Sequence, residues 1–188
     1  QTYMYQRDFA NAIYYLSELQ NKVGAMDEEE IQKTNWKYWA EFNKFLAFGH
    51  SQRDAETRTT MKNMEELNNK ALEIRLQNAS SDNQKQRIVL DVKQEIMSNQ
   101  IWYNILFGKY DEARNLLSEF KDMSEKRLSY NPNAMNGFYK FSGYLNLMEG
   151  NPEASIESYS NLSRVAMTDD SYHVYFLGLA KRGVGETE

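Results

Sequence analysis

Apolar residues recur along most of the chain at intervals of three and four positions, the spacing of one face of an α-helix. The first such stretch covers residues 8–23 and is followed by Gly24, a residue typical of helix ends. A second stretch follows Asp27, whose spacing from Glu30 matches a capping box, and it reaches Gly49. Two helices are therefore expected in this first part of the chain.

The next stretch of the chain is long and polar. Ser51 and Asp54 repeat the capping spacing and predict a helix that reaches about Asn78. Its apolar stripe is narrow and heptad-like, and it consists of Met64, Leu67, Ala71 and Ile74. Because the stripe contains too few heptads for an independent coiled coil, we expect it to pack against a neighbouring helix. The polar residues 78–83 then predict a loop.

The second half of the chain alternates helical patterns with helix-breaking residues. Pro152 occupies a first helical position, where its missing N–H costs nothing. Asn133 is the expected N-cap of one helix, and Asp169 or Asp170 is that of the last. The helices expected here cover residues 84–107, 110–130, 134–149 and 152–166, and the last lies within residues 168–185. About eight helices and no strand are expected along the whole chain, so the predicted fold class is all-α.

The composition agrees with this prediction and narrows the classes of partner. The 188 residues include only 2 Pro and 9 Gly, as expected for a high helix content. A net charge of −5 without a long basic run argues against nucleic acid as a partner. No apolar run approaches the ~20 residues of a membrane span, so we expect a soluble chain without membrane insertion. The absence of cysteine excludes disulfides and thiolate metal sites.

A similar helix start occurs three times. RDFANAIYYL begins at Arg7, GKYDEARNLL begins at Gly108 and GNPEASIESY begins at Gly150. Each places an aromatic residue or proline, an acidic or amide residue, and then Ala or Ser ahead of an apolar face. Helix pairs that recur with a period of about 20–50 residues are typical of α-solenoids, in which each pair packs on its neighbours.

Residues 138–167 resemble a tetratricopeptide repeat. The first helix has Tyr139 at a bulky position and Gly143 at a small-residue contact, and the second helix has Ser155 at the matching small contact. The bulky residues beside these contacts are Leu147, Tyr159 and Leu162. Gly178 comes 35 residues after Gly143 and starts the same pattern again.

The resemblance implies antiparallel helix pairs stacked as a tetratricopeptide-like, right-handed α-α superhelix. We expect a single helical-repeat domain over residues 1–188, taken from a longer array, with tetratricopeptide-like repeats in 84–188 and irregular helix pairs in 1–80. Ala113 fits a small-residue position, whereas Ile101 stands where a glycine or alanine is usual.

The sequence contains no recognisable catalytic, cofactor-binding or metal-binding constellation. His50 and His173 have no second histidine at ligand spacing, and we expect capping or surface roles for both. Acidic residues gather at helix starts and on exposed faces, which is the ordinary solvated pattern. We therefore expect a chain that is not an enzyme and uses no cofactor.

Tetratricopeptide repeats bind their ligands through outward positions of the first helix of each pair, which line a concave face. The resemblance places there Ser98, Trp102, Lys140, Tyr144, Leu147, Tyr172, Tyr175 and Arg182. Tyrosine and tryptophan combine a large contact area with a polar group, and arginine adds fork-shaped donors. The alternative is that Trp102, Tyr144 and Tyr175 pack between repeats. Phe141 and Tyr144 stand where relatives that grip a C-terminal carboxylate have Asn, which argues against such a ligand.

The leading functional hypothesis is a non-catalytic scaffold that binds a protein or peptide partner on this concave face. The alternative is a structural or dimerisation spacer, or a regulatory region of a larger protein whose catalytic part lies outside this chain. The aromatic helix between Trp36 and Phe48 motivates a homodimer, because it carries more rings than one chain is expected to bury.

Overall fold

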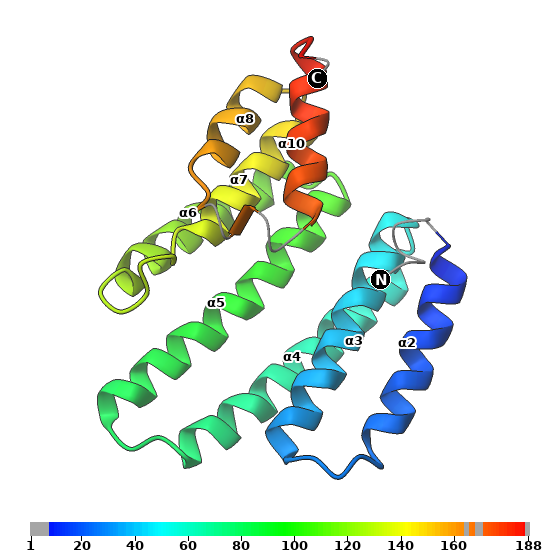
Figure 1. Ribbon diagram of the computed structural model, residues 1–188, viewed down its shortest axis with the longest axis vertical. Helices are drawn as coiled ribbons and strands as arrows, with labels where there is room; N and C mark the ends of the chain where they lie inside the picture. The colour runs from blue at the N-terminus through cyan, green and yellow to red at the C-terminus, as the bar shows by residue number, and fades with distance from the viewer. Residues whose placement is uncertain (1–7, 164–165, 168–170, 187–188) are drawn as a thin grey trace. The chain divides into compact units, whose positions relative to one another are not determined.

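The computed structural model describes residues 8–163, 166, 167 and 171–186. Within these residues the protein has eight helices and is all-α, with helices packed mostly between sequential neighbours (Figure 1). The helices are α2 Phe9–Val23, α3 Glu30–His50, α4 Asp54–Gln77, α5 Asp82–Leu106, α6 Tyr110–Arg127, α7 Asn136–Met148, α8 Pro152–Ser160 and α10 Ser171–Gly183. The predicted fold class and number of helices are confirmed.

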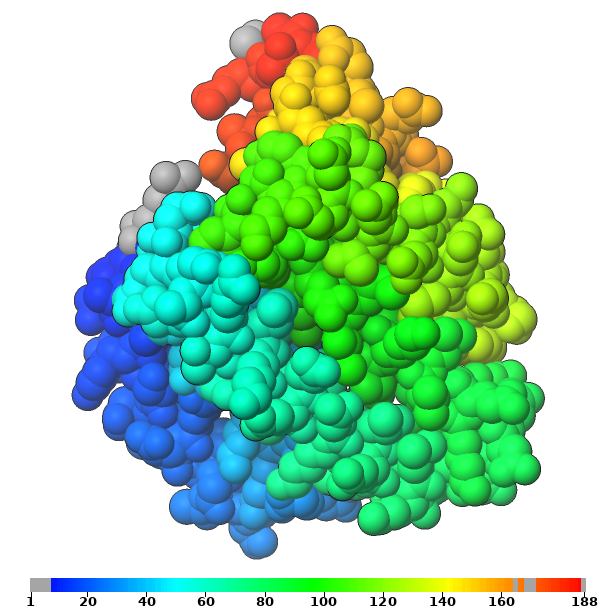
Figure 2. All heavy atoms as spheres, turned by 180° about the vertical axis from the view of Figure 1, so that it is seen from behind, coloured from blue at the N-terminus to red at the C-terminus, as the bar shows by residue number. Residues whose placement is uncertain are grey.

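The chain divides into two compact units, Gln1–Asn99 and Gln100–Glu188, and α5 contributes residues to both. In the first unit α2 packs on α3, and α3 packs on α4. Phe45 and Met64 are fully buried there, one from α3 and one from α4. Burying side chains of this size stabilises a fold by roughly 1.5–3 kcal/mol each. The polar flank of α4 is exposed and forms the cyan-to-teal band of Figure 2.

In the second unit α6 packs on α7, α7 packs on α8, and α10 packs on both α8 and α7. Phe120 of α6 meets Phe141 of α7 edge to face, with ring centroids 5.6 Å apart. Tyr159 of α8 is fully buried against the backbone of Gly143 in α7. The predicted small-residue contact at Gly143 is therefore confirmed, and Ser155 Oγ donates a hydrogen bond of 2.8 Å to the Gly143 carbonyl.

Two predicted N-caps in the first unit are wrong. Helix α3 starts at Glu30 with Glu29 in the cap position, so Asp27 lies outside the helix start. Ser51 belongs to the end of α3, because its hydroxyl donates to the Ala47 carbonyl at 2.7 Å. Helix α4 then starts after Arg53. An N-cap residue directly precedes its helix, and Ser51 lies two residues before that position, in the turn that ends α3.

The helix starts of the second unit agree in part with the prediction. Asn133 lies in a turn whose backbone N–H bonds the side chain of Asn131, and α7 starts later, after Met135. The predicted cap at Asn133 is therefore wrong. Pro152 does occupy the first turn of α8, as predicted. The predicted caps Asp169 and Asp170 lie outside the described residues.

Candidate functional site

Five of the residues predicted to bind a partner come together in the second unit, around Tyr144 of α7. They are Trp102, Lys140, Tyr144, Tyr172 and Tyr175. The Tyr144 ring lies 5.1 Å from the ring of Trp102, measured between centroids, and stacks on Phe176 at 4.3 Å. Phe141 meets Trp102 edge to face at 5.7 Å. We define the aromatic cluster as Trp102, Phe141, Tyr144, Tyr172, Tyr175 and Phe176.

Helix α10 supplies the outer part of the aromatic cluster. Tyr172 and Phe176 are four residues apart, so they lie on the same helix face, and their centroids are 5.8 Å apart. The Tyr175 ring lies 5.5 Å from the Phe176 ring. Tyr172 and Tyr175 are therefore joined through Phe176 to the buried rings of α7 and α5.

Lys140 lies at the opposite end of the aromatic cluster. Its ammonium nitrogen is 5.0 Å from the centroid of Phe141 and 6.0 Å from that of Trp102. A cation at this distance from an aromatic face is attracted by the negative potential of the ring. The rings thus hold a positive charge at this end of the aromatic cluster.

Exposure separates the residues of the aromatic cluster into two groups. Trp102 and Tyr144 are 4% and 3% exposed and lie in the core of the second unit. Burial raises the pKa of Tyr144 far above its ordinary value, so its hydroxyl stays protonated in the folded protein. Tyr175, in contrast, is 52% exposed. The buried rings can support a binding surface, while Tyr175 can touch a partner.

The remaining predicted residues lie at several places. Arg182 is exposed on the last turn of α10, and Leu147 is half-buried near the end of α7. Ser98 belongs to the first unit, where it is half-buried and donates to the Gln94 carbonyl at 3.0 Å. We define the binding face as Lys140, Leu147, Tyr172, Tyr175 and Arg182, the predicted residues of the second unit that are half-buried or exposed.

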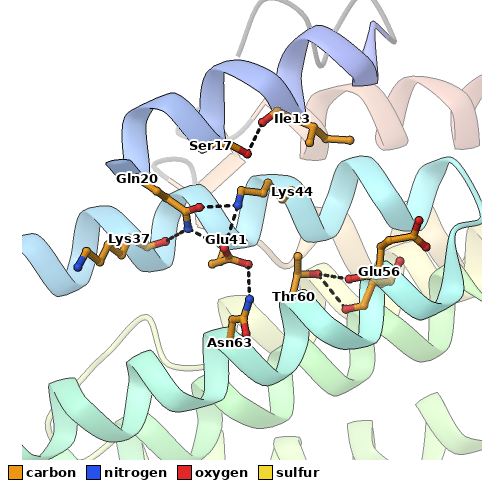
Figure 3. Close-up of polar contacts among 10 residues, drawn as sticks. Ile13, Ser17, Gln20, Lys37, Glu41, Lys44, Glu56, Thr60 and Asn63 are labelled. Carbon is orange, nitrogen blue, oxygen red and sulfur yellow. Dashed lines mark hydrogen bonds and ion pairs between the residues drawn. The ribbon is translucent and has the colours of Figure 1, made fainter. Parts of the chain in front are cut away.

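A second polar constellation, which the sequence analysis did not identify, surrounds Glu41 in the first unit (Figure 3). The carboxylate accepts hydrogen bonds from Gln20 of α2 at 2.6 Å and from Asn63 of α4 at 3.3 Å. Lys44 forms an ion pair with it at 3.0 Å and also donates to the Gln20 side chain. We call Gln20, Glu41, Lys44 and Asn63 the Glu41 cluster.

The Glu41 cluster ties three helices together. The side chains of Glu41 and Lys44 are only 7% and 13% exposed, so both charges have lost most of their water. Buried charges of this kind are tolerated when they are paired and hydrogen-bonded, and Glu41 has three donors around it. The sequence did contain a sign of this cluster. Glu41 stands one helical turn before Phe45, so helical spacing places this carboxylate on the same face of the helix as an apolar residue that is buried.

Tyr38 of α3 makes a further set of hydrogen bonds in the first unit. Tyr38 donates to the Glu95 carboxylate at 2.5 Å and accepts a hydrogen bond from the Asn99 amide at 3.1 Å. Burial, together with the neighbouring Glu95 charge, raises the pKa of Tyr38 well above its ordinary value. Tyr38 therefore acts as a fixed donor that links α3 to α5 within this unit.

Both histidines contact other parts of the protein. His173 is 6% exposed, with its Nδ1 2.9 Å from the Ala166 carbonyl oxygen, so the expected surface role is wrong for this residue. His50 is half-buried and stacks on Phe9 with centroids 6.3 Å apart. Across the described parts of the chain, no group of three or more His, Cys, Asp or Glu side chains is placed to hold a metal ion.

No described helix is both long enough and apolar enough to cross a membrane. Comparisons of the chain with models of protein families, with curated proteins and with solved structures found no match.

Proposed function

We propose that the second unit is a non-catalytic module that binds a protein or peptide partner through the binding face. The observation that carries this proposal is the placement of Tyr175, which is 52% exposed while its ring packs on the buried aromatic cluster. An exposed aromatic ring that is held by rigid neighbours loses little conformational freedom when a partner covers it. Such rings are typical anchors of protein interfaces.

Two cations of the binding face, Arg182 on α10 and Lys140 at the other end of the aromatic cluster, favour a partner with acidic or carbonyl groups. Arg182 is exposed, and its planar guanidinium can donate two parallel hydrogen bonds to a carboxylate or a backbone carbonyl. Lys140 adds a positive charge beside the rings of Phe141 and Trp102. We propose an extended or helical peptide that places an apolar side chain on Tyr175 and an acidic group toward these cations.

We further propose that the helix pairs stack in the manner of tetratricopeptide repeats, as a right-handed superhelix. The close contact of Gly143 with Tyr159 and the bond from Ser155 to the Gly143 carbonyl support this arrangement for α7 and α8. In that arrangement the binding face would lie on the concave side of the stack, as the resemblance to the family implies.

The proposal is tested by selecting peptides on the folded protein. Peptides from a random phage-displayed library are selected on the wild type, synthesised, and their affinities measured by calorimetry. Replacing Tyr175 by Ala, or Arg182 by Ala, is expected to weaken binding at least about tenfold. Leu128→Ser is the matched control, since Leu128 is 46% exposed in the same unit but lies at the end of α6. Equal affinities for the wild type, Tyr175→Ala and Arg182→Ala would refute the proposal.

A second candidate function is a spacer that dimerises through the first unit. Trp36 of α3 is 41% exposed, and Tyr14 and Tyr15 of α2 are 59% and 53% exposed, which favours a covering partner on these helices. Light scattering of the wild type and of a Trp36→Ser variant tests it. A dimer that this substitution dissociates supports the spacer, and a monomer at every concentration contradicts it.

A further inference from the structure

Four helices of this protein end in the same turn. The second residue after the end of each helix adopts a left-handed conformation, with φ of 57° at Gln52, 69° at Gly108, 80° at Gly150 and 85° at Gly185. In each turn the next N–H bonds the carbonyl five positions earlier, at 2.9, 2.8, 2.9 and 2.9 Å in chain order. This 6→1 bond is the mark of a Schellman turn. The turns therefore give a common reference for comparing α3, α5, α7 and α10.

The first three of these helices, α3, α5 and α7, share one buried position before the turn and another after it. Seven positions before the left-handed residue stand Phe45, Ile101 and Gly143, and all three are buried. Five positions after it stand Thr57, Ala113 and Ser155, and each is fully buried near the start of the next helix. A small buried residue near the start of the second helix is thus a shared feature of these three hairpins, and in two of them the second helix packs on the first, α4 on α3 and α8 on α7.

Helix α10 departs from this pattern on one face. Gly178 holds the position seven residues before its turn, and no described atom lies within 4 Å of a Cβ placed there. Val174, one turn earlier, is 55% exposed. A glycine inside a helix lowers its stability relative to alanine, and the described neighbours of Gly178 do not use the space it leaves. We define the open face as Val174, Gly178 and Lys181, which lie along one side of α10.

We propose that the open face of α10 binds an amphipathic helix of a partner polypeptide that has a small residue at its fourth position, a bulky one four residues later and an acidic first turn. The small and bulky residues follow from α8, where Ser155 bonds the Gly143 carbonyl at 2.8 Å and Tyr159 lies over Gly143. This inference rests on a different observation from the proposed function, the open space beside Gly178, and the two sites adjoin because Gly178 lies one helical turn from both Tyr175 and Arg182.

The acidic first turn follows from charge. Acidic residues occupy the first turn of the helix that comes after each of α3, α5 and α7: Asp54 and Glu56 in α4, Asp111 and Glu112 in α6, and Glu153 in α8. Lys181, which forms an ion pair with Glu186 at 3.3 Å, and Arg182 give the last turn of α10 a positive charge. An acidic helix start is therefore complementary to the end of the open face.

The experiment uses a helix-stapled peptide with the sequence of residues 151–162, whose staple lies on the face away from Ser155. It is titrated into the isotope-labelled full chain, and amide NMR shifts are followed, with the Gly178 resonance assigned from a Gly178→Ala variant. We expect shifts centred on Val174, Gly178 and Lys181, and at least about tenfold weaker binding for a peptide carrying Ser155→Leu.

The Gly178→Leu protein is expected to bind the peptide at least about tenfold more weakly, and Val174→Asp is a second variant should the first not fold. Tyr175→Ala leaves the space beside Gly178 open, so it should weaken peptide binding less than Gly178→Leu does, which distinguishes this site from the binding face.

Three results would overturn the inference. One is equal binding of the two peptides to the wild type, or equal binding of the wild-type peptide to the wild-type, Gly178→Leu and Val174→Asp proteins. Another is a shift of the Gly143 resonance instead of the Gly178 resonance, which would mean that the peptide displaces α8 from α7. The third is a Gly178 resonance that moves with protein concentration before peptide is added, which would assign the open face to a second copy of this chain.

Discussion

The ring of Tyr159 lies against Gly143 so closely that a Cβ added to this glycine would come within 2.7 Å of it. Tyr159 is fully buried, so the ring cannot move out into solvent without losing its contacts in the core. The contact holds α7 and α8 together, and it depends on the absence of a side chain at one position.

Substituting alanine at the two glycines that the sequence presents as equivalent is expected to have opposite effects. Gly143→Ala forces the added methyl into the Tyr159 ring and should destabilise the protein by about 1–3 kcal/mol. Gly178→Ala adds a methyl where no described atom is near and should stabilise α10 by about 0.5–1 kcal/mol. Urea denaturation followed by circular dichroism measures both. A Gly143→Ala variant as stable as the wild type would contradict this account of Gly143, and a destabilised Gly178→Ala variant would contradict that of Gly178.

The turn residues should respond to substitution according to their backbone conformation. Gly150 has φ of 80°, which costs an L-residue about 1–2 kcal/mol, so Gly150→Ala should destabilise the protein by about that amount. Gln52 has φ of 57° and already bears this cost, so Gln52→Gly should be neutral or stabilising by up to about 1 kcal/mol. Thermal unfolding of both variants tests this contrast. A Gln52→Gly variant that unfolds more easily than the wild type would show that the Gln52 side chain matters more than its backbone.

Breaking the Glu41 cluster on one side should be costly. Glu41→Ala leaves the largely buried Lys44 without its carboxylate and removes the acceptor of Gln20 and Asn63, so we expect a loss of about 3–5 kcal/mol. Replacing both charges, with Glu41→Leu and Lys44→Met, should recover much of that loss because no buried charge remains. Denaturation followed by tryptophan fluorescence, in a background where Trp102 of the second unit is replaced by Phe, reports on the first unit through Trp36 and Trp39. A double variant less stable than Glu41→Ala would contradict the pairing.

The buried Tyr144 should make stability fall at alkaline pH. Its pKa in the folded protein is raised by burial, whereas an unfolded tyrosine titrates near ~10. The unfolded state therefore releases the proton first, so this contribution to stability is complete below pH ~10 and is lost as the pH rises above it. Between pH ~10 and ~11, Tyr144→Phe should lose less stability than the wild type, by up to about 1.4 kcal/mol. Parallel losses in urea denaturation at these pH values would show that Tyr144 titrates normally.

The existence of the helices could be predicted from the sequence, whereas the residues that begin them were predicted less accurately. The spacing of Ala12 and Leu16 predicts α2 because a helix must bury one continuous face, and both residues are buried. Capping residues are less informative, since the spacing of Ser51 and Asp54 suits a cap of α4, whereas Ser51 lies in the turn that ends α3 and donates to the Ala47 carbonyl. The turn at Gln52 escaped prediction because a left-handed residue is usually expected to be glycine.

The candidate site could be predicted only in part. The resemblance to tetratricopeptide repeats places Tyr144, Trp102 and Tyr175 in one region, and in the structure their rings belong to the same cluster. It cannot say which of these rings is covered, because that depends on how α5, α7 and α10 approach one another. The structure buries Trp102 and Tyr144 and exposes Tyr175. Glu41 was missed because a lone acidic residue is expected to be solvated until its donors from α2 and α4 are placed around it.

The most direct test of the binding face is photocrosslinking of a library-selected peptide to the full chain. The photoreactive residue p-benzoylphenylalanine is placed at position 175, which keeps an aromatic ring there, and in separate proteins at the exposed positions Val89 and Leu128. The proposal predicts a peptide crosslink from position 175 that unlabelled peptide competes away, and only background from the other two. Equal crosslinking from all three positions, or crosslinking only from position 89 or 128, would contradict it.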